Sequence, residues 1–255
     1  MKIVTFNLRT DVKVDGENRF QFRKGIILDK LTNEAPDVVG FQEVAPAMAA
    51  FLSRYLDREY MFVGCGRMAD FSCESCKIAF RRDKYELLAL DTFWLSDTPH
   101  IPGSRFACAS EYPRVCTHVM LRPVDGGTPF HIYNTHLDHL NDEARTLGAK
   151  TILARMADDL EKWDYPAAVM GDMNAEPASR PIRTFLEDPV LGLTDHTANI
   201  PVSFHDYGRI PGVKIDYILS RGMKSTSETR AWDDVSDGIY LSDHYPLCAE
   251  LDLEK

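Results

Sequence analysis

The chain of 255 residues lacks any run approaching the roughly 20 apolar residues that a membrane-spanning helix needs. Its first residues, from Lys2 onward, read directly as a strand, without an apolar signal region or a small-residue cleavage site. No internal repeat, low-complexity segment or Pro/Gly/Ser-rich linker interrupts the chain. We therefore expect a cytoplasmic protein without membrane contact, folded as one domain over residues 1–255, and a monomer.

Thiol-rich motifs are also scarce. Six cysteines occur, at positions 65, 73, 76, 108, 116 and 248. Without a secretion signal, disulfides are not expected. Cys73-x-x-Cys76 with Cys65 upstream is compatible with half of a zinc site, but no second CxxC or matching His pair completes it. Free thiols are the favoured interpretation, and a structural metal is the alternative.

Basic clusters are few and short, and the net charge is −10. Arg81, Arg82 and Lys84 lie among acidic residues, which is typical of a solvated face. Broad nucleic-acid surfaces use clustered Lys and Arg, so the composition argues against such a surface. It does not exclude a nuclease, because bound cations also supply positive charge.

Strand-like and helical patterns alternate along the chain. Apolar and β-branched runs predict strands at 2–8, 37–41, 60–64, 77–81, 85–95, 116–122, 129–135, 167–170, 215–220 and 247–253. Amphipathic periods predict helices at 22–33, 46–56, 141–162 and 181–186. The helices are too few for eight βα units, so we predict a layered α/β fold with two stacked sheets and helices outside.

Three polar clusters stand where apolar runs stop. They are Gln42-Glu43, Gly171-Asp172-Met173-Asn174 and Ser242-Asp243-His244. Such strand ends lie at the rim of a sheet, where sites usually form. Several carboxylates beside a His need a cation or a shared proton. Oxygen ligands with few thiolates favour Mg²⁺ or Mn²⁺, so the pattern indicates metal-assisted hydrolysis.

Individual residues within these patterns suggest roles. Asp172 and Asn174 face the same way if the backbone is extended, and they suit water activation and a hydrogen bond to phosphate. Asp216 interrupts an apolar strand and needs a partner, for which His244 is the candidate. Asn7 ends the first strand. Its side chain either caps a turn or holds a metal-binding carboxylate in place. Glu43 is either a ligand or a helix-start acid, and the ligand reading is favoured.

The ordered set of motifs resembles the endonuclease/exonuclease/phosphatase superfamily, the DNase I-like fold. The motifs are Thr5-Phe6-Asn7, Gln42-Glu43, Asn134-Thr135-His136-Leu137, Gly171-Asp172-Met173-Asn174, Ile215-Asp216-Tyr217 and Ser242-Asp243-His244. The resemblance spans residues 3 to about 253. It implies a four-layered α/β sandwich, with two packed mixed sheets flanked by helices, and Mg²⁺-dependent cleavage of phosphoesters. Small bacterial hydrolases are the most similar subgroup.

The resemblance also implies the role of each site residue. Glu43 looks like the principal Mg²⁺ (or Mn²⁺) ligand, oriented by Asn7, with Asp243 as a further carboxylate on the metal side. Asp172 resembles the water-activating residue and Asn174 the transition-state donor, while Asp216 and His244 resemble a pair at the scissile phosphate. Glu74 and His136 resemble a pair that protonates the leaving oxygen. Arg114 and His205 resemble residues that contact the substrate.

These residues predict a Mg²⁺-dependent phosphoesterase acting on a phosphomonoester or phosphodiester. The alternative is an endo- or exonuclease of the same fold acting on DNA or RNA. The acidic charge and the absence of an aromatic–basic stripe favour the first, so nucleic acid is the less favoured partner. A non-catalytic binding module is disfavoured because none of the expected catalytic residues is missing.

Overall fold

A computed structural model describes residues 1–107 and 109–254, and Cys108 lies outside the described residues. Two large mixed sheets form the centre of the molecule. The first has the order β11-β15-β1-β2-β4-β3, with β12 also paired to β15, and the second has the order β5-β6-β7-β8-β10-β9. A short hairpin, β13-β14, stands apart.

The strands of the two sheets differ greatly in length. The long strands are β1 (Lys2–Asn7), β2 (Val38–Val44), β3 (Tyr60–Val63), β4 (Ser75–Arg81), β5 (Tyr85–Trp94), β6 (Val115–Pro123), β7 (Phe130–His136), β8 (Ala167–Asp172), β10 (Asp216–Arg221) and β15 (Leu247–Leu253). The short strands are β9 (Thr194–Asp195), β11 (Met223–Ser225), β12 (Arg230–Ala231), β13 (Val235–Ser236) and β14 (Ile239–Tyr240). The structure contains all ten strands that the sequence predicts. The five short strands were not predicted, because two or three residues are too few to show an alternation of apolar and polar side chains.

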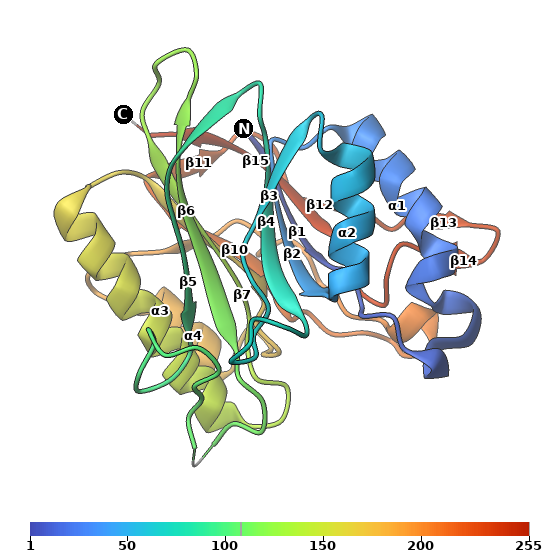
Figure 1. The fold of residues 1–255 in the computed structure, drawn as a ribbon. Coiled ribbons are helices and arrows are strands. Elements are labelled where there is room, and N and C mark those ends of the chain that lie inside the picture. The colour runs from blue at the N-terminus through green and yellow to red at the C-terminus, as the bar shows by residue number, and fades with distance from the viewer. Residues whose placement is uncertain (108, 255) are drawn as a thin grey trace.

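Helices cover the outer faces of both sheets (Figure 1). They are α1 (Phe20–Glu34), α2 (Pro46–Leu56), α3 (Asp142–Lys162) and α4 (Arg180–Leu186), with short 3₁₀ turns at Lys13–Asn18 and Asp206–Gly208. Pro46 opens α2, where its missing N–H is not needed. Asn141 caps α3 by accepting hydrogen bonds from the backbone N–H groups of Glu143 and Ala144.

Three apolar cores separate the four layers, and this confirms the predicted sandwich. Ile27, Leu31 and Leu52 of α1 and α2 pack on one face of the first sheet. The side chains of α3 and α4 pack on the outer face of the second sheet. The third core lies between the sheets, where Ile3 meets Met170. Figure 1 shows α1 and α2 on one side of the paired sheets and α3 and α4 on the other.

The alternation of side chains along a strand decides which polar residues reach the layer between the sheets. In β8, Ala167 and Val169 face α3 and α4, whereas Ala168 and Met170 face the other sheet. Asp172 has the same parity as Ala168 and Met170. It therefore points into the seam between the sheets, at the end where the apolar core stops.

The sheets come close together just beneath this end. Gln42 Nε2 donates to Asn134 Oδ1 across the seam at 2.6 Å, and Asn134 Nδ2 donates to the carbonyl oxygen of Phe41 at 2.9 Å. A Cβ at Gly40 would lie 2.7 Å from Asn134 Oδ1. The glycine thus permits the close approach, and the buried amides fix how the two sheets are aligned.

One strand extends further than its apolar run predicted. β2 continues past Phe41 to Val44, with a shift of register between these two residues where it pairs with β4. Glu43 lies in this bulge with a φ of 59°, in the left-handed region that non-glycine residues rarely adopt. The bulge redirects the Glu43 side chain, and such backbone strain is concentrated at functional sites.

The cysteines match the free-thiol interpretation. Cys65, Cys73, Cys76, Cys116 and Cys248 are all free. Among the residues that the structure describes, the cysteines form no cluster with the spacing of metal ligands. The described helices also include none with the length and apolar character required to cross a bilayer.

Candidate active site

The site lies where the ends of four strands converge at one edge of the seam. β1 and β2 run parallel and bring Asn7 beside Gln42, and β7 and β8 run parallel and bring His136 beside Asp172. The antiparallel β10 begins there, with Asp216 opposite Asp172. Sequence positions more than 200 residues apart therefore share one rim.

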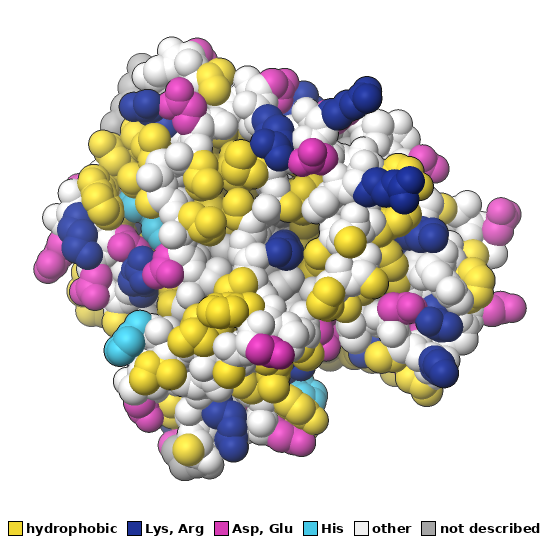
Figure 2. Space-filling view, viewed as in Figure 1, with side chains coloured by type: hydrophobic (Ala, Val, Ile, Leu, Met, Phe, Trp, Pro, Cys, Tyr) yellow, Lys and Arg dark blue, Asp and Glu magenta, His cyan; other side chains and the backbone are white. Residues whose placement is uncertain are grey.

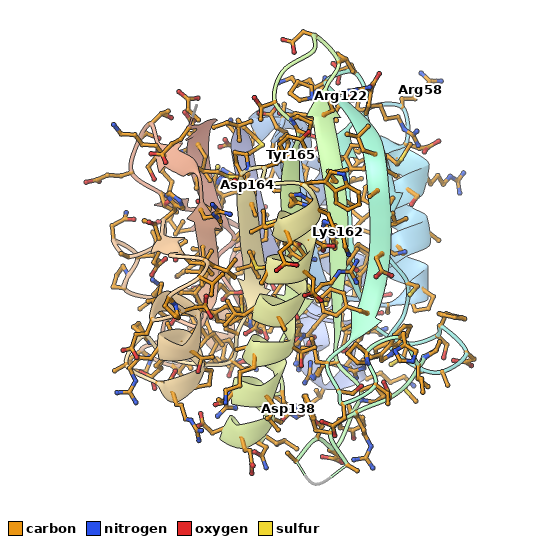
Figure 3. The ribbon with its side chains drawn as sticks, turned by 90° about the vertical axis from the view of Figure 1, so that its left-hand side faces the viewer. Arg58, Arg122, Asp138, Lys162, Asp164 and Tyr165 are labelled. Atoms are coloured by element: carbon orange, nitrogen blue, oxygen red, sulfur yellow. The ribbon has the colours of Figure 1, made fainter. Side chains whose placement is uncertain are left out.

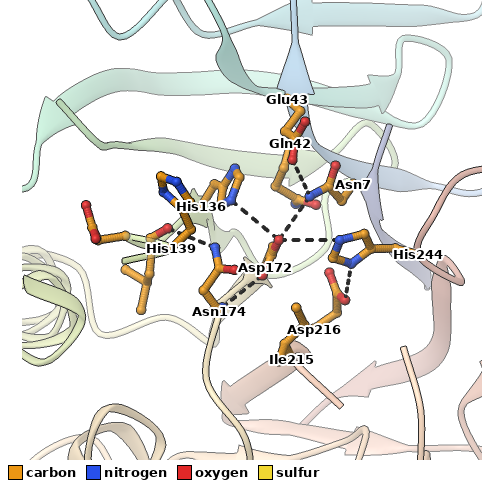
Figure 4. A network of polar contacts seen from close by, with 12 residues as sticks. Asn7, Gln42, Glu43, His136, His139, Asp172, Asn174, Ile215, Asp216 and His244 are labelled. Atoms are coloured by element: carbon orange, nitrogen blue, oxygen red, sulfur yellow. Dashed lines mark hydrogen bonds and ion pairs between the residues drawn. The ribbon is translucent and has the colours of Figure 1, made fainter. Parts of the chain in front are cut away.

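Asp172 is the centre of the polar network (Figure 4). Its Oδ2 accepts a hydrogen bond from Asn7 Nδ2 at 2.9 Å and lies 3.4 Å from His136 Nε2 and 3.7 Å from His244 Nε2. Its Oδ1 accepts from the backbone N–H of Asn174 at 2.8 Å. Burial, with a contribution from the Asp216 charge, raises the pKa of Asp172 to about 7.

Asp216 and His244 form the pair expected from the sequence. His244 Nδ1 and Asp216 Oδ2 are 2.7 Å apart, and both side chains are buried. Burial alone would lower the pKa of His244, but the charge of Asp216 and its hydrogen bond raise this pKa to about 10. His244 is therefore an imidazolium at neutral pH, and its Nε2 faces Asp172.

A small residue near this pair was not identified from the sequence as part of the site. The buried hydroxyl of Ser203 accepts hydrogen bonds from the backbone N–H groups of Ile215 and Asp216, at 2.9 and 3.0 Å. It holds the start of β10 and, with it, the Asp216 carboxylate.

Glu43 and Asn7 are in contact, as expected. Asn7 Nδ2 donates to Glu43 Oε1 at 3.1 Å, and the backbone N–H of Thr10 donates to Oε2 at 2.9 Å. One Asn7 amide nitrogen thus bridges the Glu43 and Asp172 carboxylates. Asp243 lies on the same side of the site, with its Oδ2 3.7 Å from Arg9 Nε, and burial raises its pKa.

The geometry assumed for Asn174 was wrong. Asn174 follows β8 with a φ of 47°, so the backbone from Asp172 to Asn174 is not extended. The Asn174 Nδ2 donates to the carbonyl oxygen of Leu137 at 3.1 Å. Both Asp172 and Asn174 still line the same cavity, because the turn folds Asn174 back over the strand end.

Glu74 and His136 do not form the pair expected from the resemblance. Glu74 Oε2 instead forms an ion pair with Arg67 Nη1 at 2.8 Å, and His136 is next to Asp172. Burial and the charges of Arg114 and Arg67 lower the pKa of His136 well below its usual value. The ring is therefore neutral at physiological pH. Glu74, His136 and Arg114 all line the cavity.

His205 lies outside the cavity, contrary to its expected contact with substrate. Its imidazole is buried and stacks on Tyr245, with ring centroids 3.9 Å apart, and its Nδ1 accepts from the backbone N–H of Gly208. The backbone N–H of His205 donates to the carbonyl oxygen of Asp243. The residue thus supports the Asp243–His244 loop from behind.

The cavity has a volume of about 380 Å³. Its lining includes three residues that sequence reasoning missed, Arg9, Arg67 and His139. Arg9 follows the first motif by two positions, so its position offered a signal. Arg67 lies in an irregular loop between β3 and β4, where the sequence has no periodic pattern to reveal it.

The donor atoms around the cavity are suited to a divalent cation. Asp172, Asp216 and His244 offer ligand atoms within 4.8 Å of one another, a spacing that could hold a metal ion. His244 Nδ1, however, lies 2.7 Å from Asp216 Oδ2, so a metal at this cluster would compete with the contact between these two residues. Glu43 and Asp243 also line the cavity and supply carboxylate oxygens, the donor type that Mg²⁺ and Mn²⁺ favour.

Comparison with known families and structures agrees with the observed fold. A profile described as the Endonuclease/Exonuclease/phosphatase family matches residues 4–244. No curated protein sequence matches the chain significantly.

Solved structures with similar folds include a Bacteroides vulgatus protein described as an endonuclease/exonuclease/phosphatase, with 31% identity, a TM-score of 0.92 and coverage of 99% of this chain and 98% of that one. A Bacteroides thetaiotaomicron mannosyl-6-phosphatase has 22% identity and a TM-score of 0.84, over 99% of this chain and 100% of that one. D. rerio TDP2, complexed with a single-strand DNA product, has 16% identity and a TM-score of 0.73, over 99% and 98%. The last two structures are so different in sequence that their similarity to this chain shows only a shared fold.

Proposed function

Because the chain belongs to the Endonuclease/Exonuclease/phosphatase family, we propose that it is a Mg²⁺-dependent hydrolase of phosphate esters, in which water attacks phosphorus in line with the leaving group. The observation that carries the proposal is the convergence on one cavity of Asp172, His244 and Glu43. Structurally similar proteins named as a phosphatase and as a complex with a DNA product are compatible with this reaction class.

Asp172 is proposed to orient the attacking water and to take its proton. Its raised pKa, about 7, matches a base that works near neutral pH. The hydrogen bonds from Asn7 and from the backbone of Asn174 hold the carboxylate in place. A cation bound nearby would favour the ionised form of Asp172.

The negative charge that develops on the phosphoryl oxygens is proposed to be stabilised by His244 and Asn174. His244 carries a positive charge maintained by Asp216, and Asn174 lines the same cavity with an amide that can donate a hydrogen bond. His136, which lines the same cavity with its Nε2 3.4 Å from Asp172 Oδ2, is the proposed contact for the leaving oxygen. Its low pKa means that the ring would gain a proton only when a substrate anion offsets the arginine charges.

The divalent cation is proposed to bind at Glu43 and Asp243, with Asn7 orienting Glu43. When bound, it would polarise a phosphoryl oxygen and neutralise its charge.

The alternative, a nuclease, remains the second candidate. On the face shown in Figure 2, Lys and Arg side chains are intermixed with Asp and Glu rather than gathered in one track. Together with the net charge of −10, this favours a small ester over a polymer.

A substrate screen tests the proposal. Purified protein with Mg²⁺ is incubated with nitrophenyl phosphate, sugar phosphates, nucleotides, single-stranded DNA and RNA. We expect hydrolysis of at least one ester, loss of activity in EDTA and recovery on adding Mg²⁺. Glu43→Gln should abolish the activity and weaken Mn²⁺ binding measured by electron paramagnetic resonance, while the exposed Asp125→Asn should leave both unchanged. Hydrolysis that persists fully in EDTA would contradict the metal assignment.

A further inference from the structure

An exposed tyrosine borders the cavity. Tyr112 belongs to the cavity lining, and 41% of the residue is exposed. It stands in the loop just before β6, and the next residue, Pro113, is buried and anchors this end of the loop. Small-molecule sites are typically lined by aromatic side chains together with a few polar groups. The Tyr112 ring therefore offers contact area that the chain itself leaves uncovered.

Two other residues of the cavity hold this ring in place. The guanidinium carbon of Arg67 lies 5.4 Å from the Tyr112 ring centroid, and the His139 ring lies 6.4 Å from it, with the two planes tilted by 30°. An arginine over a tyrosine ring is a favourable contact. Because these neighbours restrict the ring, a ligand that packs against it has less side-chain freedom to remove.

The contacts of Tyr112 place it on the same side of the cavity as His136. His139 Nδ1 lies 2.9 Å from Arg114 Nη2. Arg114, Arg67 and His136 together border a second, smaller cavity that adjoins the first. His136 is the proposed contact for the leaving oxygen. The Tyr112 ring thus belongs to the part of the wall where the leaving group of a substrate would lie.

The other phenyl ring of the lining belongs to a different part of the wall. Phe204 lines the cavity, and its ring centroid lies 4.9 Å from that of His244, which is paired with Asp216. His244 is proposed to stabilise the phosphoryl oxygens. Phe204 is therefore next to the phosphoryl group in the proposed reaction, whereas Tyr112 is next to the leaving group.

We infer that Tyr112 is a specificity-determining residue, whose ring packs against a ring carried by the leaving group close to the ester oxygen. This inference rests on the hydrolase function proposed above. The recognised chemistry is a flat ring face, which an aromatic ring or the C–H face of a sugar ring presents. Tyrosine supplies such contacts with a large, rigid side chain at low cost in conformational entropy. The cavity volume of about 380 Å³ lies in the range of small-molecule sites.

Two esters of primary alcohols provide the test. Benzyl phosphate and ethyl phosphate release alcohols of similar acidity, and only the first carries a ring. The kcat/KM values are measured for the wild type, Tyr112→Ala and Tyr112→Phe, and the methyl diesters of both alcohols are included in case the protein cleaves diesters. We expect Tyr112→Ala to lower the benzyl value by about fivefold and the ethyl value by less than about twofold. Tyr112→Phe keeps the ring and should stay within about twofold of the wild type on both.

Binding without turnover gives a second, independent readout. Benzylphosphonate and ethylphosphonate carry a P–C bond in place of the ester bond, so the proposed reaction does not cleave them. Titration calorimetry in Mg²⁺ should show that the wild type binds benzylphosphonate about fivefold more tightly than ethylphosphonate. Tyr112→Ala should lose this preference.

Tyr55→Ala is the matched control. Tyr55 is 58% exposed and stands near the end of α2, three residues before Arg58. Figure 3 shows Arg58 at the opposite end of the molecule from Asp138, which is the neighbour of His139 in the chain. Both the ester preference and the phosphonate preference of this variant should equal those of the wild type.

Three further esters distinguish the kinds of ring. Glucose 6-phosphate carries a sugar ring, adenosine 5′-monophosphate also carries a nucleobase, and glycerol 1-phosphate carries no ring. A loss in Tyr112→Ala on both ring-bearing esters assigns the contact to a sugar ring, and a loss on the nucleotide alone assigns it to the base. An equal loss on the glycerol ester would count against a ring contact.

The outcomes separate the inference from the function on which it rests. Equal losses on the benzyl and ethyl esters would mean that Tyr112 only supports Arg67 and His139, and they would overturn the inference. An unchanged phosphonate preference in Tyr112→Ala would overturn it as well. A wild-type protein that cleaves none of these esters, nor any member of the wider panel, would overturn the hydrolase proposal, while the phosphonate titration would still decide the ring contact.

Discussion

At the scale of single residues, the site depends on groups whose protonation is set by burial. Asp172 is held near a pKa of 7 and His244 near 10, although both are buried in the same network. Burial raises the pKa of Asp172, and the Asp216 charge raises both pKa values, because it repels a negative charge on Asp172 and stabilises a positive charge on His244. The two values differ because an imidazole ordinarily has a higher pKa than a carboxyl group. A base and a permanent cation are therefore placed 3.7 Å apart.

Replacing the proposed base should separate chemistry from folding. Asp172→Asn keeps the shape of the side chain, so we expect an unchanged melting temperature within a few degrees and a kcat lowered by about a hundredfold or more. Rates on the substrate found in the screen, with Asp125→Asn as the exposed control, would measure this. A rate close to that of the wild type would show that another group activates the water.

Asp216 and His244 should behave as one unit. Asp216→Asn and His244→Gln are each expected to remove most of the activity, by about two powers of ten, because either change ends the charged pair. The double variant should lose little more, since coupled catalytic residues are not additive. A double-mutant cycle of kcat/KM gives the measurement. Losses that multiply in the double variant would mean that the two residues act independently.

At the scale of secondary-structure elements, the close pairing of β7 with β8 determines where Asp172 points. Gly171 pairs with Thr135 in the parallel register and has a φ of 145°. A Cβ at this position would lie 1.9 Å from the carbonyl oxygen of Thr135. No larger residue fits without displacing the backbone that carries Asp172.

Gly171→Ala should therefore affect both stability and activity. The matched control is Gly126→Ala, because Gly126 also has a positive φ (88°) but has open space around the missing Cβ. Strain at positive φ should cost each variant about 1–2 kcal/mol. The clash should cost Gly171→Ala roughly 1–3 kcal/mol more and should lower kcat as well. Urea unfolding and kinetics would test this, and equal unfolding free energies would contradict the proposed clash.

At the scale of the whole molecule, stability should depend on pH through a buried histidine far from the cavity. His118 Nε2 and His131 Nδ1 are 2.9 Å apart beneath α3. Burial lowers the pKa of His118 to about 3, despite the opposing charge of Asp159, while His131 and Arg155 lower it further. A depressed histidine pKa contributes stability above the unfolded-state value of about 6.5, and this contribution is lost as the pH falls toward 3.

We expect the free energy of unfolding to decrease below about pH 6.5, with His118 contributing a slope of up to about 1.4 kcal/mol per pH unit. His118→Phe should remove this part of the slope and retain ring stacking on Tyr133, whose centroid is 4.4 Å away. Urea titrations between pH 4.5 and 7.5 would measure it, with the exposed His100→Asn as control. An unchanged slope in His118→Phe would assign the acid sensitivity to other groups.

The sequence by itself determined the elements and much of the site. Apolar and β-branched runs located the ten long strands, and the polar clusters where these runs stop predicted a site at the rim of a sheet. The Asp216–His244 pair also followed from the sequence, because a carboxylate inside an apolar strand must have a partner. These inferences depend on local periodicity and on the cost of burying charge, which the residue order carries.

Only the tertiary structure decided which loop side chains meet at the cavity. Glu74 pairs with Arg67 rather than with His136, and His205 is buried behind the site instead of lining it. Arg67 enters from an irregular loop, whose path depends on packing against distant segments rather than on a repeating pattern. Contacts between such segments depend on how the chain is arranged in three dimensions, and the residue order alone does not reveal them.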